Sequence, residues 1–115
     1  MIKVLIERLE DTREIVFFSV SGHADYDRSG KDIVCAGVSA VTIGTVNAVE
    51  ALLQVELSAE EKSGLLQVEI PDQLEQNTRM NVQLLLESMI VMLRSIRDSY
   101  EKYIAIKENF VGKRR

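Results

Sequence analysis

Twice along this chain of 115 residues, two short segments with the apolar patterns of strands precede one long segment with helical spacing. Alternation is the period of a strand with one buried face, and a spacing of three or four residues is that of an amphipathic helix. The pattern predicts an α+β fold in the order ββαββα, with an antiparallel sheet of about four strands and two helices packed on it. Because a chain this short rarely holds two separate cores, we expect one domain over residues 1–115.

The first half of the chain predicts a hairpin followed by a helix. Strands are expected at residues 2–7 and 15–20, with turn residues at 10–12 between them. A polar loop with glycines follows at residues 21–31, and helical spacing begins at Asp32, which is the best N-cap candidate in the segment.

The second half predicts another hairpin and a longer helix. Alternation at residues 54–58 and 66–70 indicates two strands, with the loop around residues 60–62, and Pro71 ends the hairpin. The helix that follows has Asp72 or Asn77 as its expected N-cap and continues to about Ile106. Two helices on four short strands leave apolar surface uncovered, so we expect a homodimer, unless the long helix alone covers that surface.

Charge and cysteine content exclude several classes of function. The net charge of −4 makes nucleic acid a poor partner, and the basic residues 113–115 lie at a terminus, where fraying is common. One cysteine rules out an internal disulfide and fits a reducing compartment. The apolar run at residues 33–53 is interrupted by polar side chains, which favours a buried helix over a membrane span. We therefore expect a cytoplasmic protein that contacts neither membrane nor nucleic acid.

The chain's one histidine and one cysteine, His23 and Cys35, flank the polar loop. If Asp32 is the N-cap, Cys35 lies in the first helical turn, where free N–H groups and the helix dipole favour a thiolate and could hold an oxyanion. The loop is long enough to fold back and bring His23 to the sulfur, which would pair a nucleophile with a base. Ser39 lies one turn further along the same face, and Asp32 could instead orient His23.

A partial calcium-binding pattern occupies the same loop. Asp25, Asp27, Ser29 and Gly30 stand at the first, third, fifth and sixth positions of such a loop. The twelfth position is Ala36 rather than the required glutamate, so we expect no calcium. One histidine and one cysteine are also too few for a convincing zinc site, and we expect no cofactor.

Two segments closely resemble the bacterial ribosomal-processing cysteine protease (Prp) family, whose members carry Gly-His, then Asp-Ile-Val-Cys, then Ser. These segments are Ser21-Gly22-His23-Ala24 and Ser29-Gly30-Lys31-Asp32-Ile33-Val34-Cys35-Ala36-Gly37-Val38-Ser39-Ala40. The clear resemblance covers about residues 14–53. The resemblance implies a cytoplasmic homodimer with an α+β fold. It also implies an endopeptidase that removes the N-terminal extension of large-subunit ribosomal protein number twenty-seven.

The resemblance also implies roles for individual residues. Cys35 would be the nucleophile and His23 the general base and acid, while Gly22, Asp32 and Ser39 would shape or polarise the site.

The loop departs from the family pattern in its charges, at Asp25, Asp27 and Arg28. An acidic loop would favour a substrate with Lys or Arg beside the cleaved bond. The alternative function is a non-catalytic, ribosome-associated binding module. In that module Cys35 is inert packing in an apolar helix, and Ser39 bonds back to its own helix.

Overall fold

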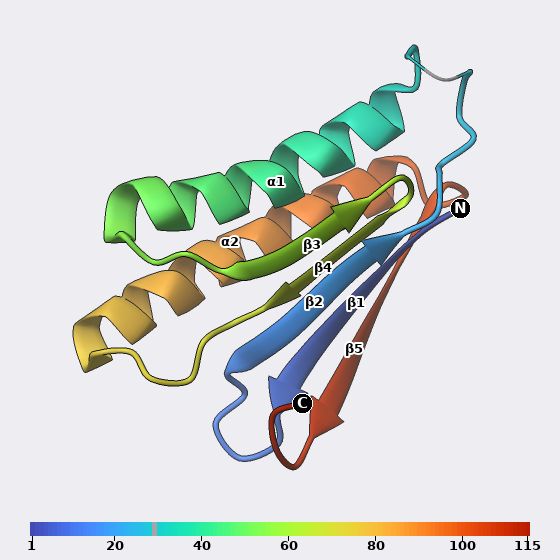
Figure 1. The fold of residues 1–115 in the computed structure, drawn as a ribbon. Helices are drawn as coiled ribbons and strands as arrows, with labels where there is room; N and C mark the ends of the chain where they lie inside the picture. Colours follow the sequence, from blue (N-terminus) through green and yellow to red (C-terminus); the bar gives the residue numbers. More distant parts are fainter. Residues whose placement is uncertain (29) are drawn as a thin grey trace.

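The computed structural model describes residues 1–28 and 30–115, which form two helices on one face of a five-stranded sheet (Figure 1). The elements are β1 (Ile2–Leu9), β2 (Ile15–Ser21), α1 (Ile33–Leu53), β3 (Ser58–Lys62), β4 (Leu65–Glu69), α2 (Gln76–Ser99) and β5 (Ile104–Val111). The strand order is β3-β4-β2-β1-β5, and all neighbours are antiparallel except β1 and β5. The predicted α+β class and the two helices packed on a sheet are confirmed.

The first hairpin and α1 lie where the sequence pattern places them. In the β1–β2 pair, Val4 is opposite Val20 and Ile6 is opposite Phe18, so one face of the hairpin is apolar. Within the described ranges, α1 is the one helix long and apolar enough to cross a membrane by length and composition. Its inner face is buried against the rest of the protein, and α1 packs on α2.

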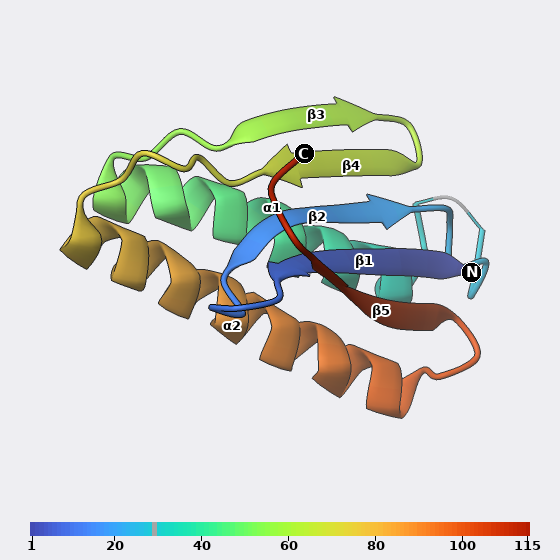
Figure 2. The same ribbon diagram turned by 90° about the horizontal axis from the view of Figure 1, so that it is seen from below.

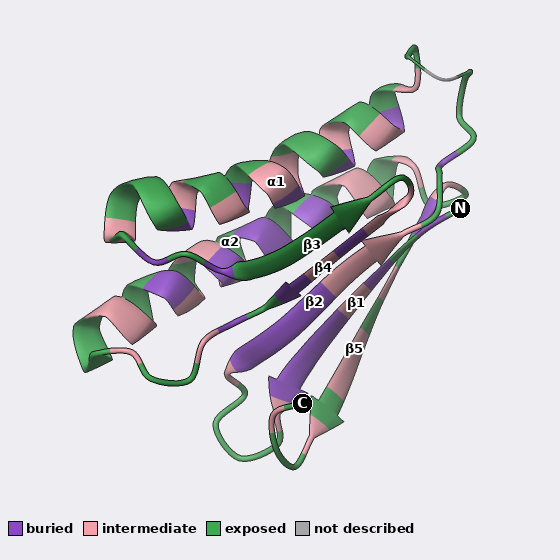
Figure 3. Ribbon diagram, in the orientation of Figure 1, coloured by how far each residue is buried: buried purple, intermediate pink, exposed green. Residues whose placement is uncertain are grey.

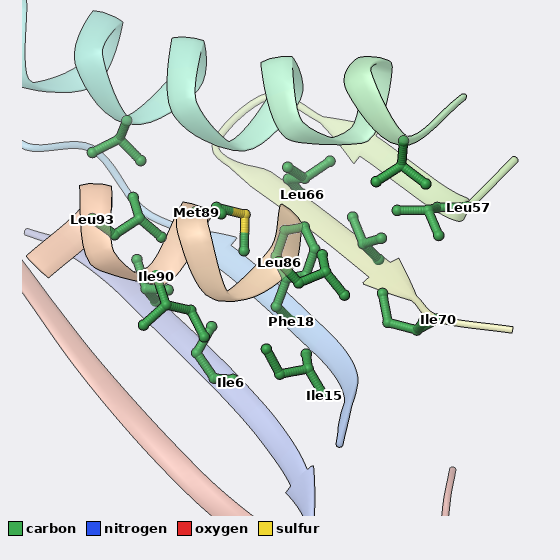
Figure 4. Packing of buried hydrophobic residues seen from close by; sticks show 14 of the residues in the cluster. Ile6, Ile15, Phe18, Leu57, Leu66, Ile70, Leu86, Met89, Ile90 and Leu93 are labelled. Atoms are coloured by element: carbon green, nitrogen blue, oxygen red, sulfur yellow. The ribbon is translucent and has the colours of Figure 1, made fainter. Parts of the chain in front are cut away.

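The core lies between the helices and the sheet (Figures 3 and 4). Its largest fully buried side chains come from β1, β2, α2 and β5 and include Ile6, Ile15, Phe18, Leu86, Met89, Ile90, Leu93 and Ile104. Figure 4 shows the side chains of β1 and β2 facing those of α2. Alternate strand residues and one face of α2 therefore meet, as the two periodicities require.

The second hairpin begins later than predicted. Residues 60–62, expected as its loop, belong to β3, and the turn is formed by Ser63 and Gly64, with φ +73° at Gly64. Residues 54–57 form no strand, although Val55 and Leu57 are buried in the core. Every residue of β3 is exposed (Figure 3), so this edge strand lacks the alternation that marks a half-buried one.

The predicted end of the second helix at Ile106 is wrong. Helix α2 ends at Ser99, and residues 104–111 form β5, which pairs in parallel with β1 from Ile2 opposite Ile104 onward. The N-cap is Glu75, whose side chain accepts hydrogen bonds from the next helical N–H groups, rather than Asp72 or Asn77. The sheet is thus mixed. It contains three of the four predicted strands, has β3 at Ser58–Lys62 instead of residues 54–58, and adds the parallel strand β5.

The basic C-terminal residues are docked rather than frayed. Figure 2 shows the C-terminal segment crossing the face of the sheet opposite the helices. Arg114 donates to Glu14 and to the carbonyl of Ile70. Arg115 binds Glu7, and its guanidinium lies 3.8 Å from the centre of the Phe17 ring. The expectation of a frayed terminus is therefore wrong for these two residues. They pair with the carboxylates of Glu7 and Glu14, whose side chains are only 12% and 14% exposed.

Candidate active site

Asp32 organises both the start of α1 and the loop before it. Its Oδ1 accepts hydrogen bonds from the N–H groups of Val34 and Cys35, both at 3.0 Å. Its Oδ2 accepts from the N–H groups of Tyr26 at 3.0 Å and Asp27 at 3.4 Å. Desolvation raises the pKa of this carboxyl, but the backbone donors outweigh it and hold the pKa below its usual value. Of the two roles that the sequence left open for Asp32, the structure shows the capping one.

The loop folds back onto the first turn of α1. The backbone N–H of Ala24 donates to Sγ of Cys35 at 3.3 Å, and Ala24 itself is buried in the core. Cys35 is partly exposed, and the neighbouring His23 is exposed. The contact therefore brings the histidine's own segment to the sulfur.

Three N–H groups at the start of α1 already have acceptors and are not free to receive an oxyanion. Those of Val34 and Cys35 bind the Asp32 side chain, and that of Ala36 binds the Asp32 carbonyl at 3.0 Å. The expectation that these helical donors hold a tetrahedral intermediate is wrong for this conformation. The N–H of Ala24 is the donor that the structure places at the sulfur instead.

The turn between β3 and β4 packs against His23 from the other side. A Cβ atom at Gly64 would lie only 3.0 Å from Nε2 of His23, and the Gly64 carbonyl accepts the N–H of Gly22 at 2.9 Å. Gly22 has φ +84°, and a Cβ there would lie 2.5 Å from the carbonyl oxygen of Met1. Figure 1 shows this turn at the same end of the molecule as the start of α1. Both glycines therefore allow close backbone approach around the histidine.

Two hollows open on either side of the histidine and cysteine. The first has a volume of about 600 Å³ and includes apolar side chains from β1, β2, α1 and β4. The second has a volume of about 590 Å³ and includes the carboxylates of Asp25, Asp27 and Asp32. Four residues line both hollows: His23, Cys35, Ser39 and Ser63. Gly22 lines the first hollow, so the five residues expected at the site are gathered around these two hollows.

A metal site is not formed by the side chains that the structure describes. Among those residues, no three histidine, cysteine or acidic side chains come together in a way that could hold an ion. Ser29 of the partial calcium pattern lies outside the described residues.

The arrangement suits acyl transfer. A partly exposed thiol and an imidazole open onto the same hollows, where a peptide carbonyl could approach both. Sequence reasoning missed Ala24, Ser63 and Gly64. A hairpin turn some forty residues from the histidine carries no local signal of its position, and a backbone N–H is the same in every residue except proline.

Comparison with known proteins places these features in a family. The model of the family described as cysteine protease Prp matches residues 1–105. The ribosomal processing cysteine protease Prp of Bacillus subtilis is 39% identical over 113 residues, covering 96% of this chain and 100% of the relative. Its counterpart in Staphylococcus aureus is 31% identical over 100 residues, covering 85% and 91%.

Solved structures agree in fold with this chain. The crystal structure of the essential ribosomal processing protease Prp from S. aureus with a covalently linked product peptide has a TM-score of 0.85 at 31% identity. The S. aureus protease with a substrate peptide has a TM-score of 0.80 at 30% identity. Each comparison covers 95% of this chain and 100% of the solved chain.

Proposed function

This chain belongs to the cysteine protease Prp family, and we propose that it removes the N-terminal extension of large-subunit ribosomal protein number twenty-seven during ribosome maturation. Its activity class is that of a cysteine protease, which excludes the alternative of a non-catalytic module. The observation that carries the proposal is the partly exposed Cys35 sulfur, which opens with His23 onto two hollows able to take a peptide.

The proposed reaction begins at Cys35. His23 takes the thiol proton, and the sulfur attacks the carbonyl carbon of the peptide bond to form a tetrahedral intermediate. His23 then gives this proton to the leaving nitrogen, the C–N bond breaks, and a thioester remains on Cys35. Water attacks the thioester with His23 as base, which releases the new carboxylate and restores the thiol.

Developing negative charge on the carbonyl oxygen needs a donor, and the N–H groups of Val34, Cys35 and Ala36 already have acceptors. The N–H of Ala24 already lies against the sulfur at 3.3 Å, so a small shift would direct it to an oxygen on the attacked carbon. Ser39 and Ser63 line both hollows and would contact the peptide backbone on either side of the scissile bond.

The two hollows differ in chemistry, and this difference supports a preference along the substrate. Asp25, Asp27 and Asp32 in the second hollow would favour Lys or Arg on that side of the cleaved bond. A peptide in which neutral residues replace these Lys or Arg residues should be cleaved more slowly at low salt than the otherwise identical peptide that carries them. Equal cleavage of both peptides would refute this preference.

A homodimer in the cytoplasm is part of the same proposal. Four apolar side chains on the outer side of α2 are exposed: Met80, Leu84, Val91 and Met92. Met80, Leu84 and Val91 share one helical stripe and Met92 widens it, as expected of a face that a second copy covers. Sedimentation should give a dimer, and Leu84→Glu should shift it toward monomer; a wild-type chain that sediments as a monomer would rule the dimer out.

The direct test uses a synthetic peptide with the N-terminal extension of the same organism's ribosomal protein. We expect one cleavage, identified by mass spectrometry, and at least about a thousandfold loss with Cys35→Ala and with His23→Ala. Circular dichroism should show both variants folded. A folded Cys35→Ala variant that cleaves at the wild-type rate would reject the mechanism.

A further inference from the structure

All three tyrosines of the chain, which has no tryptophan, meet in one cluster beside the catalytic loop. Tyr26 belongs to the loop between His23 and Asp32, whereas Tyr100 and Tyr103 belong to the connection between α2 and β5. The Tyr26 ring centre lies 5.5 Å from that of Tyr100 and 5.0 Å from that of Tyr103. The interplanar angles of 89° and 78° are those of favourable edge-to-face pairs.

Tyr100 and Tyr103, which contact the Tyr26 ring, are hydrogen-bonded to regular secondary structure. The N–H of Tyr100 donates to the last turn of α2, and the N–H of Tyr103 donates to the Tyr100 carbonyl at 2.9 Å. The Tyr103 carbonyl in turn accepts the N–H of Ile2 at 2.9 Å. The two rings therefore move with α2 and β1.

The loop on the other side has few such ties. Gly22, Asp25 and Gly30 all have positive φ, which leaves this segment short of regular hydrogen bonding. Its main chain is held by Asp32, through the N–H groups of Tyr26 and Asp27, and by the sulfur, through the N–H of Ala24. At its start, the N–H of Gly22 donates to the Gly64 carbonyl. The Tyr26 ring supplies the aromatic contacts between this loop and the end of α2.

We propose that Tyr26 is a positioning residue, whose ring, held by Tyr100 and Tyr103, keeps His23 and the Ala24 N–H at Cys35. The inference deepens the proposed function and rests on it for its effect on catalysis. The Tyr26 side chain remains 41% exposed, so the contact is one-sided and can open without disturbing the core. The contacts join rings, so the hydroxyl is dispensable.

Three variants and a control test this assignment. Tyr26→Ala removes both ring contacts, Tyr103→Ala removes one of the two, and Tyr26→Phe keeps both. Phe110→Ala is the matched control, because Phe110 is a comparably exposed aromatic residue, at 47%, near the far end of β5.

We expect Tyr26→Ala to lower kcat about tenfold with little change in KM, because the variant misplaces the catalytic groups but still binds the substrate. Amide hydrogen exchange over residues 22–28 should speed up about tenfold, while exchange in β1 and α2 stays the same. Tyr103→Ala leaves the pair with Tyr100, so it should change kcat and exchange in the same direction by a smaller factor. Tyr26→Phe and Phe110→Ala should match the wild type.

The outcomes separate the two proposals. Wild-type exchange over residues 22–28 in Tyr26→Ala, or an equal loss in Tyr26→Phe, would overturn the positioning role. A raised KM with unchanged kcat would also overturn it, because it would make Tyr26 a substrate contact. If the wild-type chain cleaves no ribosomal peptide, the proposed function fails, and the exchange rates still decide whether the ring holds the loop.

Discussion

The backbone N–H of Ala24 and the sulfur of Cys35 lie 3.3 Å apart, although eleven residues separate them in the chain. This hydrogen bond closes the loop that follows β2 onto the first turn of α1. The main-chain N–H of a buried alanine therefore fixes where the exposed His23 stands relative to the sulfur. The first turn of α1 positions Cys35, and the loop that follows β2 places His23 and the Ala24 N–H around it.

Asp32→Asn should separate the capping of α1 from the anchoring of the loop. Asparagine is a good N-cap and keeps one oxygen for the N–H groups of Val34 and Cys35. Its amide nitrogen cannot accept the N–H groups of Tyr26 and Asp27. We expect a Tm near that of the wild type and a kcat about tenfold lower, measured with the ribosomal peptide.

Asp32→Ala is the companion variant, because it removes both sets of hydrogen bonds. It should lower the Tm as well as kcat. An Asp32→Asn variant that cleaves as fast as the wild type would show that the Oδ2 contacts do not position the loop.

Gly64→Ala should damage the site through His23. The new Cβ would approach Nε2 of His23 to 3.0 Å at a residue with φ +73°, so both the ring and the turn must shift. We expect a stability loss of about 1–2 kcal/mol from the left-handed backbone and at least a tenfold loss of kcat. Urea unfolding and peptide cleavage measure the two effects.

Gly112→Ala is the control for Gly64→Ala, because a Cβ at Gly112 meets nothing within 4 Å. It should leave both stability and cleavage unchanged. A folded Gly64→Ala variant with full activity would mean that the hairpin turn does not hold the histidine.

Arg8→Met should destabilise the fold by about 2 kcal/mol. The Arg8 side chain is 10% exposed and binds Glu87 at 2.6 Å and Glu108 at 2.8 Å, which joins β1, α2 and β5. Removing it deprives Glu87 of this partner, whereas Glu108 keeps its ion pair with Arg94 at 2.8 Å. The 46% and 27% exposure of the two carboxylates moderates the cost. Arg97→Met breaks only an exposed pair with Asp98 and should cost less than about 0.5 kcal/mol in the same urea titration.

The ion pairs of Arg8 with Glu87 and Glu108 also predict that the free energy of unfolding decreases at acidic pH. The hydrogen bond from Arg8 holds the pKa of Glu108 below its ordinary value of 4.5, against an opposing effect of desolvation. Since the folded state favours the charged form, this contribution is fully present above pH 4.5 and is lost as pH falls through the lower folded value. The unfolding free energy of Arg8→Met should therefore fall less steeply below that pH, and an unchanged slope would contradict the assignment.

Deleting Arg114 and Arg115 should cost about 1–2 kcal/mol, because Glu7 and Glu14 then lose partners at largely buried positions. The measurement is urea unfolding, with Lys113→Ala, at an exposed position beside them, as the control. A deletion variant as stable as the control would mean that the tail only rests on the sheet.

The parts of the fold predicted correctly are those with local causes. The alternation in β1, the β-branched and aromatic residues of β2 and the Asp32 cap of α1 lie within a few residues of what they determine. The β5 strand was missed because its partner is β1, about a hundred residues away, and its apolar residues continue the spacing of α2. The β3 strand was missed because all five of its side chains are exposed.

The site divides in the same way. The motif around Cys35 placed His23, Asp32 and Ser39 together, and all three residues line the second hollow. The close approach of Gly64 to the histidine depends on the pairing of β4 with β2, which no short segment encodes. Sequence reasoning assigned the oxyanion to N–H groups of the helix. It could not show that Asp32 already binds these groups through one carboxylate oxygen and its carbonyl, and binds the loop through its other carboxylate oxygen.

The reactivity of the sulfur tests the central pairing of Cys35 with His23 most directly. The second-order rate constant for alkylation of Cys35 by iodoacetamide should be measured at neutral pH in the wild type and in His23→Ala. Mass spectrometry confirms the modified residue, and circular dichroism confirms the fold. The account predicts that the His23→Ala variant reacts at least about tenfold more slowly, because in the proposed mechanism the imidazole of His23 takes the thiol proton. Equal rates in the two folded proteins would contradict it.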